Sequence, residues 1–194
     1  MSIAPRVKQR STEVQPYRWT RQEYEKMVEI NLFSPEARLE LIEGEILTMA
    51  SQTSYHAVAV SKAQEALRII YHKNYYIRVQ MPLALSDNSE PEPDIAVVAG
   101  NADDYWNAHP TTAMLVVEVA YSSLDHDKQR KRHLYARWQL PEYWLLNLND
   151  RQLEVYREPQ NSDYQSRSIF VAGDSVTPLS HPDGLIAVAD LLPR

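Results

Sequence analysis

The stretch PEPDIAVV at residues 91–98, followed later by MLVVEV at residues 114–119, decides the fold of this chain. Both runs are almost continuously apolar, which is typical of central strands covered on both faces of a sheet. Each also carries an acid, Asp94 at the start of the first strand and Glu118 within the second. A carboxylate in a strand built for burial is costly unless something neutralises it. We therefore expect neighbouring strands whose acids are balanced by a divalent cation.

The pattern before these strands predicts helices and strands in alternation. A capping-box sequence, Thr20 to Glu23, opens a short helix to about residue 31. Alternation over residues 39–49 around a central Glu-Gly predicts a hairpin. Apolar residues at helical spacing over residues 52–72 predict a helix that packs on a sheet. Period-two alternation over residues 75–85, interrupted by a proline, predicts an edge strand or a bulge.

The pattern after these strands continues the mixed α and β order. Residues 125–138 predict a polar-rich helix, with Leu134 and Trp138 facing inward, that stops before Pro141. Three further strands and a terminal turn are expected, at residues 143–149, 152–157, 164–171 and 188–192.

Composition sets bounds on the function. With 194 residues, 44% hydrophobic and 24% charged, the chain suits one globular domain, which we place at residues 16–194 after a flexible arm at residues 1–15. The lack of cysteine excludes thiolate zinc sites and cysteine nucleophiles. A net charge of -6 does not favour a polyanionic partner. No apolar window approaches a membrane span and no secretory signal is recognisable, so we expect a soluble cytoplasmic protein.

Several local strings share their order and spacing with a known family. They are ELIEGEI at residues 40–46, His56, EPDI at 92–95, VEV at 117–119 and LPEYW at 140–144. On these strings the chain resembles the Uma-type family of restriction endonuclease-like proteins, within the PD-(D/E)XK nuclease superfamily, over residues 17 to 192. The resemblance implies an α/β restriction-endonuclease-like core, in which a central mixed β-sheet is flanked by helices and an N-terminal helix and hairpin are added.

The resemblance also implies a metal-dependent DNA endonuclease. Asp94, Glu118 and the backbone carbonyl of Val119 would hold Mg²⁺ or Mn²⁺, which are hard ions that prefer oxygen ligands. The superfamily pattern places a lysine two residues after the second acid, where this chain has Ala120. Lys131 on the following helix matches the place of the displaced lysine, and its long stem allows the ammonium to return to the acids.

Three residues are expected to complete the outer part of the site, namely Glu43, Glu45 and His56. Each main assignment has a structural alternative. Asp94 can be a strand-entry residue that accepts backbone hydrogen bonds, and Glu118 can pair with a basic residue of the following helix. Lys131 can belong to a solvated face of that helix.

Two other classes of function remain open. The first is a degenerate nuclease that binds nucleic acid without cleaving it, which Ala120 and the acidic net charge favour. The second is a homodimeric interaction protein that pairs exposed strands, at residues 75–85 or 152–157, across a two-fold axis. A serine hydrolase is disfavoured because the chain has no Gly-x-Ser-x-Gly elbow. Only four glycines are present, and they form no phosphate-binding loop.

Overall fold

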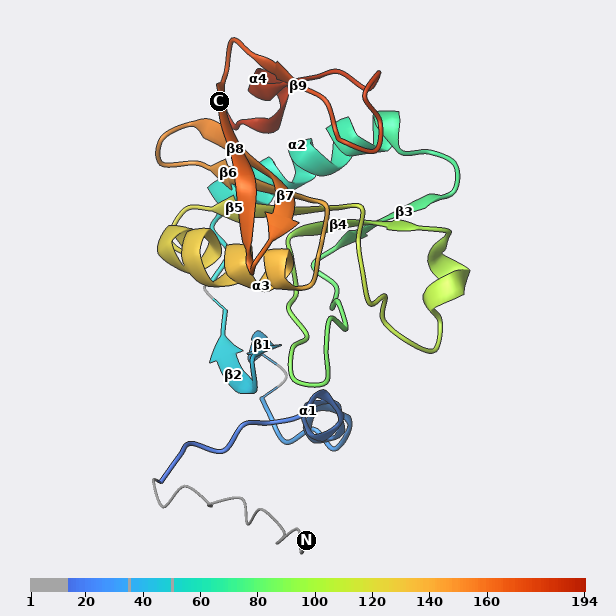
Figure 1. The fold of residues 1–194 in the computed structure, drawn as a ribbon, viewed down its shortest axis with the longest axis vertical. Coiled ribbons are helices and arrows are strands. Elements are labelled where there is room, and N and C mark those ends of the chain that lie inside the picture. Colours follow the sequence, from blue (N-terminus) through green and yellow to red (C-terminus); the bar gives the residue numbers. More distant parts are fainter. Residues whose placement is uncertain (1–13, 35, 50) are drawn as a thin grey trace, which may run out of the picture.

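The computed structural model describes residues 14–34, 36–49 and 51–194, so most of the expected arm lies outside the described residues (Figure 1). A six-stranded sheet runs through the structure in the order β3-β4-β5-β6-β7-β8. Only β5 and β6 are parallel, and every other neighbouring pair is antiparallel. The expected mixed sheet and the adjacency of the two acidic strands are therefore confirmed. The strands are β3 (Tyr75–Val79), β4 (Ile95–Ala99), β5 (Leu115–Ala120), β6 (Glu142–Asn147), β7 (Gln152–Gln160) and β8 (Asp163–Val171).

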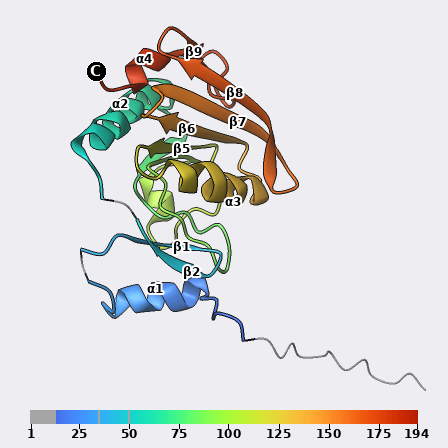
Figure 2. The same cartoon turned by 90° about the vertical axis from the view of Figure 1, so that its left-hand side faces the viewer.

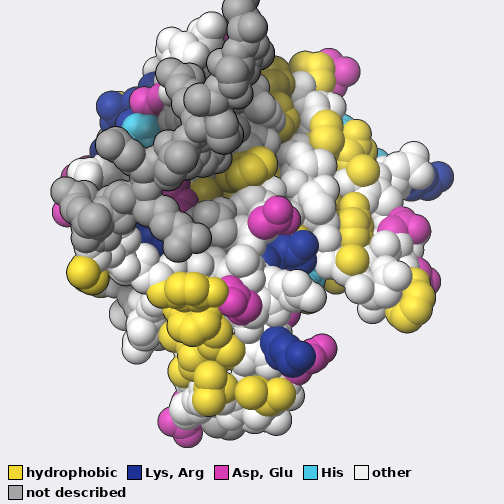
Figure 3. All heavy atoms as spheres, turned by 60° about the horizontal axis from the view of Figure 1, so that its bottom comes forward, with side chains coloured by type: hydrophobic (Ala, Val, Ile, Leu, Met, Phe, Trp, Pro, Cys, Tyr) yellow, Lys and Arg dark blue, Asp and Glu magenta, His cyan; other side chains and the backbone are white. Residues whose placement is uncertain are grey.

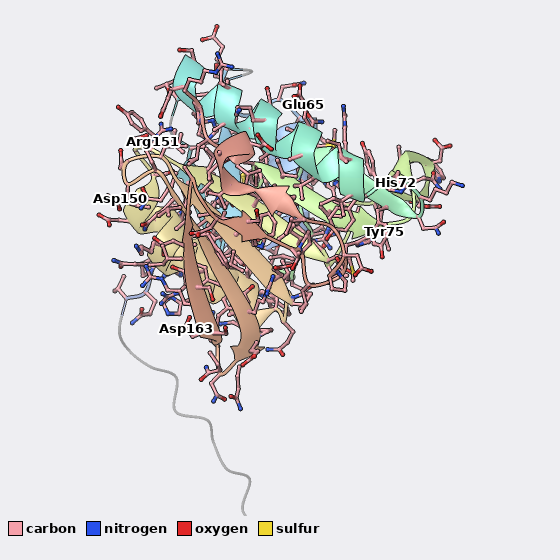
Figure 4. The ribbon with its side chains drawn as sticks, turned by 90° about the horizontal axis from the view of Figure 1, so that it is seen from above. Glu65, His72, Tyr75, Asp150, Arg151 and Asp163 are labelled. Atoms are coloured by element: carbon pink, nitrogen blue, oxygen red, sulfur yellow. The ribbon has the colours of Figure 1, made fainter. Side chains whose placement is uncertain are left out.

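Helices cover both faces of this sheet because its strands are apolar on both sides. Helix α2 (Ser54–Ile70) lies across one face, with Glu65 on its outer side (Figure 4). The π-helix η2 (His126–Lys131) and helix α3 (Arg132–Arg137) cover the other face. Side chains alternate along a strand, and Val117 and Val119 pack in the α2 core whereas Val116 and Ala120 pack in the α3 core. Glu118 therefore shares the face that α3 covers.

The added N-terminal elements lie at one end of the molecule, opposite to α4 and the C-terminus (Figures 1 and 2). They are α1 (Arg21–Glu29), β1 (Leu39–Ile42) and β2 (Glu45–Thr48). The predicted capping box is present, since Thr20 and Glu23 satisfy each other's backbone donors. The remaining elements are η1 (Ala102–Tyr105), β9 (Ser175–Val176), β10 (Ile186–Ala187) and α4 (Val188–Leu191). Within the described residues, no helix combines the length and apolarity needed to cross a membrane.

Three sequence predictions were wrong in detail. Strand β3 ends at Val79 instead of residue 85, because Gln80 adopts a φ of +50° and turns the chain away from the sheet. The strand at residues 152–157, expected to be exposed, is internal because β8 covers it, whereas β3 and β8 are the edges. Trp138 does not face inward but is 41% exposed, and Gln139 ends the helix with a φ of +57°.

Gly44 provides a test of the hairpin geometry. Its φ is +79°, and a Cβ at this position would lie 2.7 Å from the Cβ of Arg18. Replacement of Gly44 by alanine is expected to lower the free energy of unfolding by about 1–2 kcal/mol, measured by urea denaturation, because it adds backbone strain and a clash. Gly173→Ala is the control, since a Cβ there meets no described atom within 4 Å. Equal stability of the two variants would contradict the turn geometry.

Candidate active site

A pocket of about 380 Å³ opens beside the ends of the two acidic strands. Its walls come from the β1–β2 hairpin, the start of α2, the segment before β4, the end of β5, and η2. Asp94, Glu118 and Lys131 all line it, so the structure brings the three principal predicted residues together. Their strands are neighbours in the sheet, and η2 follows β5 directly in the chain.

Asp94 is held in place by several donors. Its Oδ2 accepts a hydrogen bond of 2.9 Å from the backbone N–H of Val119 and lies 3.1 Å from His56 Nε2. Its Oδ1 accepts from Gln80 Nε2 at 3.1 Å. Burial by itself raises the pKa of Asp94, but the hydrogen bonds from His56, Val119 and Gln80 outweigh burial and hold that pKa below its ordinary value. The carboxylate is therefore charged and fixed in orientation.

Glu118 is buried between Asp94 and Lys131. Its Oε2 accepts from the backbone N–H of Asp94 at 3.4 Å, and its Oε1 accepts from the Tyr135 hydroxyl at 2.7 Å. The Nζ of Lys131 lies 3.1 Å from the same Oε1. Lys131 is only 4% exposed, so it does not belong to a solvated helix face. The ammonium therefore lies directly beside the Glu118 carboxylate.

The local helix geometry explains how Lys131 reaches this position. Residues His126–Lys131 form a π-helix at the start of the segment that the sequence predicted as one polar-rich helix over residues 125–138. A π-helical turn carries an extra residue and rotates the side chains that follow, and such turns are frequent at functional sites. Ser123 secures the start of this segment through a 2.5 Å hydrogen bond to Asp127. Asp127 and Lys131 are both buried at the pocket wall.

Glu40 on β1 is a site residue that the sequence analysis missed. Its Oε2 lies 3.1 Å from Lys131 Nζ and accepts from the backbone N–H of Glu92 at 3.3 Å. Its Oε1 lies 3.5 Å from His126 Nε2. Glu40 is 2% exposed and lines the pocket. An acid within an apolar strand was the available signal, the same signal that marked Glu118.

The other predicted acids of the hairpin lie elsewhere. Glu43 pairs with Arg137, and Glu45 pairs with Arg18 and Arg130. Neither Glu43 nor Glu45 lines the pocket. His56 does line it, through its contact with Asp94. The hairpin therefore contributes Glu40 to the pocket and uses its other acids in ion pairs at the surface.

The remaining basic residues near η2 are also paired. Lys128 lies 2.7 Å from the buried Glu154, and Arg132 lies 3.1 Å from Asp163. Arg130 pairs with Glu45 and still lines the pocket. Arg38 at the hairpin supplies a second arginine to the pocket wall.

The pocket has an excess of buried negative charge. Glu40, Asp94, Glu118 and Asp127 are all buried, and Lys131 is the single buried lysine among the described residues that faces them. Burial raises the pKa of Glu118 to about 8, although Lys131 opposes the shift. Burial alone would lower the pKa of Lys131, but Glu118 and Glu40 raise it well above its usual range. The raised pKa of Lys131 reflects the acids around it, whereas the raised pKa of Glu118 reflects chiefly its burial.

This donor set fits Mg²⁺ or Mn²⁺. Two adjacent carboxylates provide hard oxygen ligands, and Mg²⁺ usually takes only one or two carboxylates while keeping several water molecules. The excess of acids over cations gives a dication a favourable place. In the part of the chain that the structure describes, no group of three or more His, Cys, Asp or Glu side chains is arranged as a complete metal site. The protein ligands would therefore be Asp94, Glu118 and a backbone carbonyl.

Comparison with known proteins agrees with the fold. No curated protein sequence matches the chain. The structure resembles the crystal structure of a "putative nuclease belonging to DUF820" from Anabaena variabilis, with a TM-score of 0.71 and 19% sequence identity. The match covers 89% of this chain and 97% of that one, and it shows a common fold. The model of the Uma2 family, described as "Putative restriction endonuclease", matches residues 21–190. The chain therefore belongs to the Uma2 family and has the fold of a restriction endonuclease-like nuclease.

Proposed function

We propose that the protein is a metal-dependent endonuclease that hydrolyses phosphodiester bonds in DNA. Asp94, Glu118 and the carbonyl of Val119 hold Mg²⁺ or Mn²⁺, and Lys131 acts beside them. The observation that carries this proposal is the 3.1 Å contact between Lys131 Nζ and Glu118 Oε1 inside a pocket with excess acid. Through this contact, Lys131 takes the role of the lysine that the sequence lacks at residue 120.

The roles of the side chains follow from their contacts. The Asp94 carboxylate is oriented by His56 and Gln80, so it is prepared to bind a cation without rearrangement. The Lys131 ammonium has three donors, and Glu118 and Glu40 engage two of its directions. Asp127 Oδ1 lies 4.0 Å from the ammonium, beyond hydrogen-bonding distance, so the third donor is available to a phosphoryl oxygen or to the attacking water. A bound Mg²⁺ or Mn²⁺ supplies Lewis-acid polarisation and lowers the pKa of a water molecule.

Metal binding is the first prediction of this proposed function. Saturating Mn²⁺ is expected to raise the melting temperature of the chain by on the order of 5 °C, because a ligand that binds only the folded state stabilises it. Asp94→Asn and Glu118→Gln should lose this increase, measured by differential scanning fluorimetry. Glu65→Gln, on the exposed side of α2, is the matched control and should keep it. An increase retained by all three variants would contradict the assigned ligands.

Cleavage is the second prediction. Nicking of supercoiled plasmid with Mg²⁺ or Mn²⁺ is expected to fall by about 10²–10³-fold in Lys131→Met, because one preorganised donor to the developing charge is lost. Glu118→Gln should abolish nicking altogether. The control Lys73→Met changes an exposed lysine and should nick the plasmid at the normal rate. Equal activity in all variants would reveal a contaminating nuclease. Metal binding without cleavage by the unaltered chain would favour the nucleic-acid-binding alternative.

Glu40 is expected to act through Lys131. Glu40→Gln removes one of the two carboxylates that hold the ammonium, so nicking should slow by about tenfold or more while the Mn²⁺-induced thermal shift is preserved. Glu40→Asp keeps the charge on a shorter stem and should restore part of the rate. Loss of the thermal shift in Glu40→Gln would instead make Glu40 a metal ligand.

We also propose that the protein forms a homodimer through the edge strand β8. It is nine residues long, and its Ile169 and Val171 are about half exposed. An edge of this length is available for pairing with a second copy. Size-exclusion chromatography with light scattering tests this, and a monomer at micromolar concentration would contradict it.

A further inference from the structure

A second pocket lies beside the active site and has no role in the proposed chemistry. Its volume is about 410 Å³, within the range of small-molecule sites. It opens at the α1 end of the molecule, which Figure 3 brings forward and where hydrophobic side chains gather. Apolar and aromatic side chains form much of its wall, namely Tyr24, Val28, Phe33, Leu39 and Pro82.

Glu90 at this pocket lacks a partner for its charge. The residue is 4% exposed, and its Oε2 is buried with no hydrogen-bond partner among the described residues. Its backbone is already satisfied, because Glu90 and Leu41 exchange two hydrogen bonds. Burial raises the pKa of Glu90 to about 7. A buried acceptor of this kind is costly unless a donor arrives.

The neighbouring histidine does not supply that donor. Arg78 Nη2 lies 3.2 Å from His109 Nδ1, and a guanidinium has only donors, so Nδ1 is the accepting nitrogen. His109 then carries its proton on Nε2, which lies 3.7 Å from Glu90 Oε1. This separation is beyond hydrogen-bonding distance. Burial and Arg78 lower the pKa of His109, which keeps the ring neutral.

The pocket therefore offers carboxylate oxygens as hydrogen-bond acceptors between walls that are largely apolar. Glu25 and Glu92 line it together with Glu90, and these three acids outnumber the single arginine of the wall, Arg38, which disfavours an anionic ligand such as a free phosphate. The terminal torsion of a glutamate is soft, so the Glu90 carboxyl group can turn either oxygen to a ligand. A carboxylate accepts two parallel hydrogen bonds. Among the nucleobases, guanine presents two adjacent N–H donors on its pairing edge.

We propose that this second pocket binds an unpaired guanine, with the Glu90 carboxylate accepting from its N1–H and N2–H groups. Unstacked bases are commonly read by hydrogen bonds to the pairing edge and by contact with aromatic or apolar side chains. Arg38 and Glu92 line both pockets, so a base held here lies next to the proposed cleavage site. The inference rests on the proposed function for its nucleic-acid substrate and adds a preference for one base.

Binding of free nucleosides tests the pocket without relying on cleavage. Deoxyguanosine is expected to bind about tenfold more tightly than deoxyinosine, which lacks only the 2-amino group, in titrations followed by NMR. Glu90→Gln should abolish this difference, because an amide presents one acceptor in place of two. Glu25→Gln makes the same charge change in the same pocket, but Glu25 pairs with Arg21 at 2.6 Å, so the difference should remain.

The outcomes separate the two proposals. Equal affinity for the two nucleosides, or a preference unaffected by Glu90→Gln, overturns the guanine pocket whatever the plasmid assay shows. A preference that depends on Glu90 in a protein that does not nick plasmid keeps the pocket and removes the endonuclease. Val28 is a half-exposed residue of the pocket wall. Val28→Trp should weaken the binding of both nucleosides, because the larger side chain narrows the entrance of the pocket.

Urea denaturation at two pH values shows whether Glu90→Gln is folded, and it tests the protonation state of Glu90 in the folded protein. The charged groups that face Glu90 are Glu25, Arg21 and Glu92, and the titratable but neutral His109 lies beside it. A pKa raised from 4.5 to about 7 means that the folded state holds a proton more tightly, so stability is lost as pH rises between these values. The urea midpoint of Glu90→Gln should exceed that of the unaltered chain at pH 8 and match it at pH 4, below both pKa values. Equal midpoints at pH 8 would show that Glu90 is compensated and would overturn its role as an open acceptor.

Discussion

The buried ammonium of Lys131, held between Glu118 and Glu40, is the interaction on which the rest of the site depends. It joins the central sheet, the π-helix and the N-terminal hairpin at one point, through two contacts of 3.1 Å. Removing one partner of a buried ion pair typically costs roughly 3–5 kcal/mol, because the other charge is left uncompensated. The hairpin is therefore tied to the core through charge as well as through apolar contacts.

The same arrangement shows how Lys131 reaches the acids although residue 120 is an alanine. Ala120 is fully buried in the core on the α3 side of the sheet, where it packs among apolar side chains. The following helix lies over that same face, and its π-helical turn directs Lys131 toward the acids. A flexible stem of four methylene groups makes the position of the ammonium less dependent on the position of the backbone. Lys131 therefore lies beside Glu118 although residue 120 is an alanine.

The two pockets differ in how their charges are compensated. In the candidate active-site pocket, Asp94 receives hydrogen bonds from three residues, and its charge is maintained. In the second pocket, Glu90 has no such donors, and burial shifts its pKa in the opposite direction. The same residue chemistry therefore produces a preorganised anion in one place and an open acceptor in the other. Arg38 and Glu92 separate the two environments.

The sequence by itself determined the mixed α and β class, the adjacency of the two acidic strands, the N-terminal helix and the hairpin. These features depend on local periodicity and on capping and turn residues such as Thr20 and Gly44, which act over a few residues. Only the tertiary structure showed that Glu40, and neither Glu43 nor Glu45, reaches the pocket. It alone showed the π-helical turn that ends at Lys131, and the lack of a hydrogen-bond donor to Glu90 Oε2 among the described residues. Such features depend on contacts between segments far apart in the chain, and a local pattern such as the acid within an apolar strand marks a candidate residue without specifying its partners.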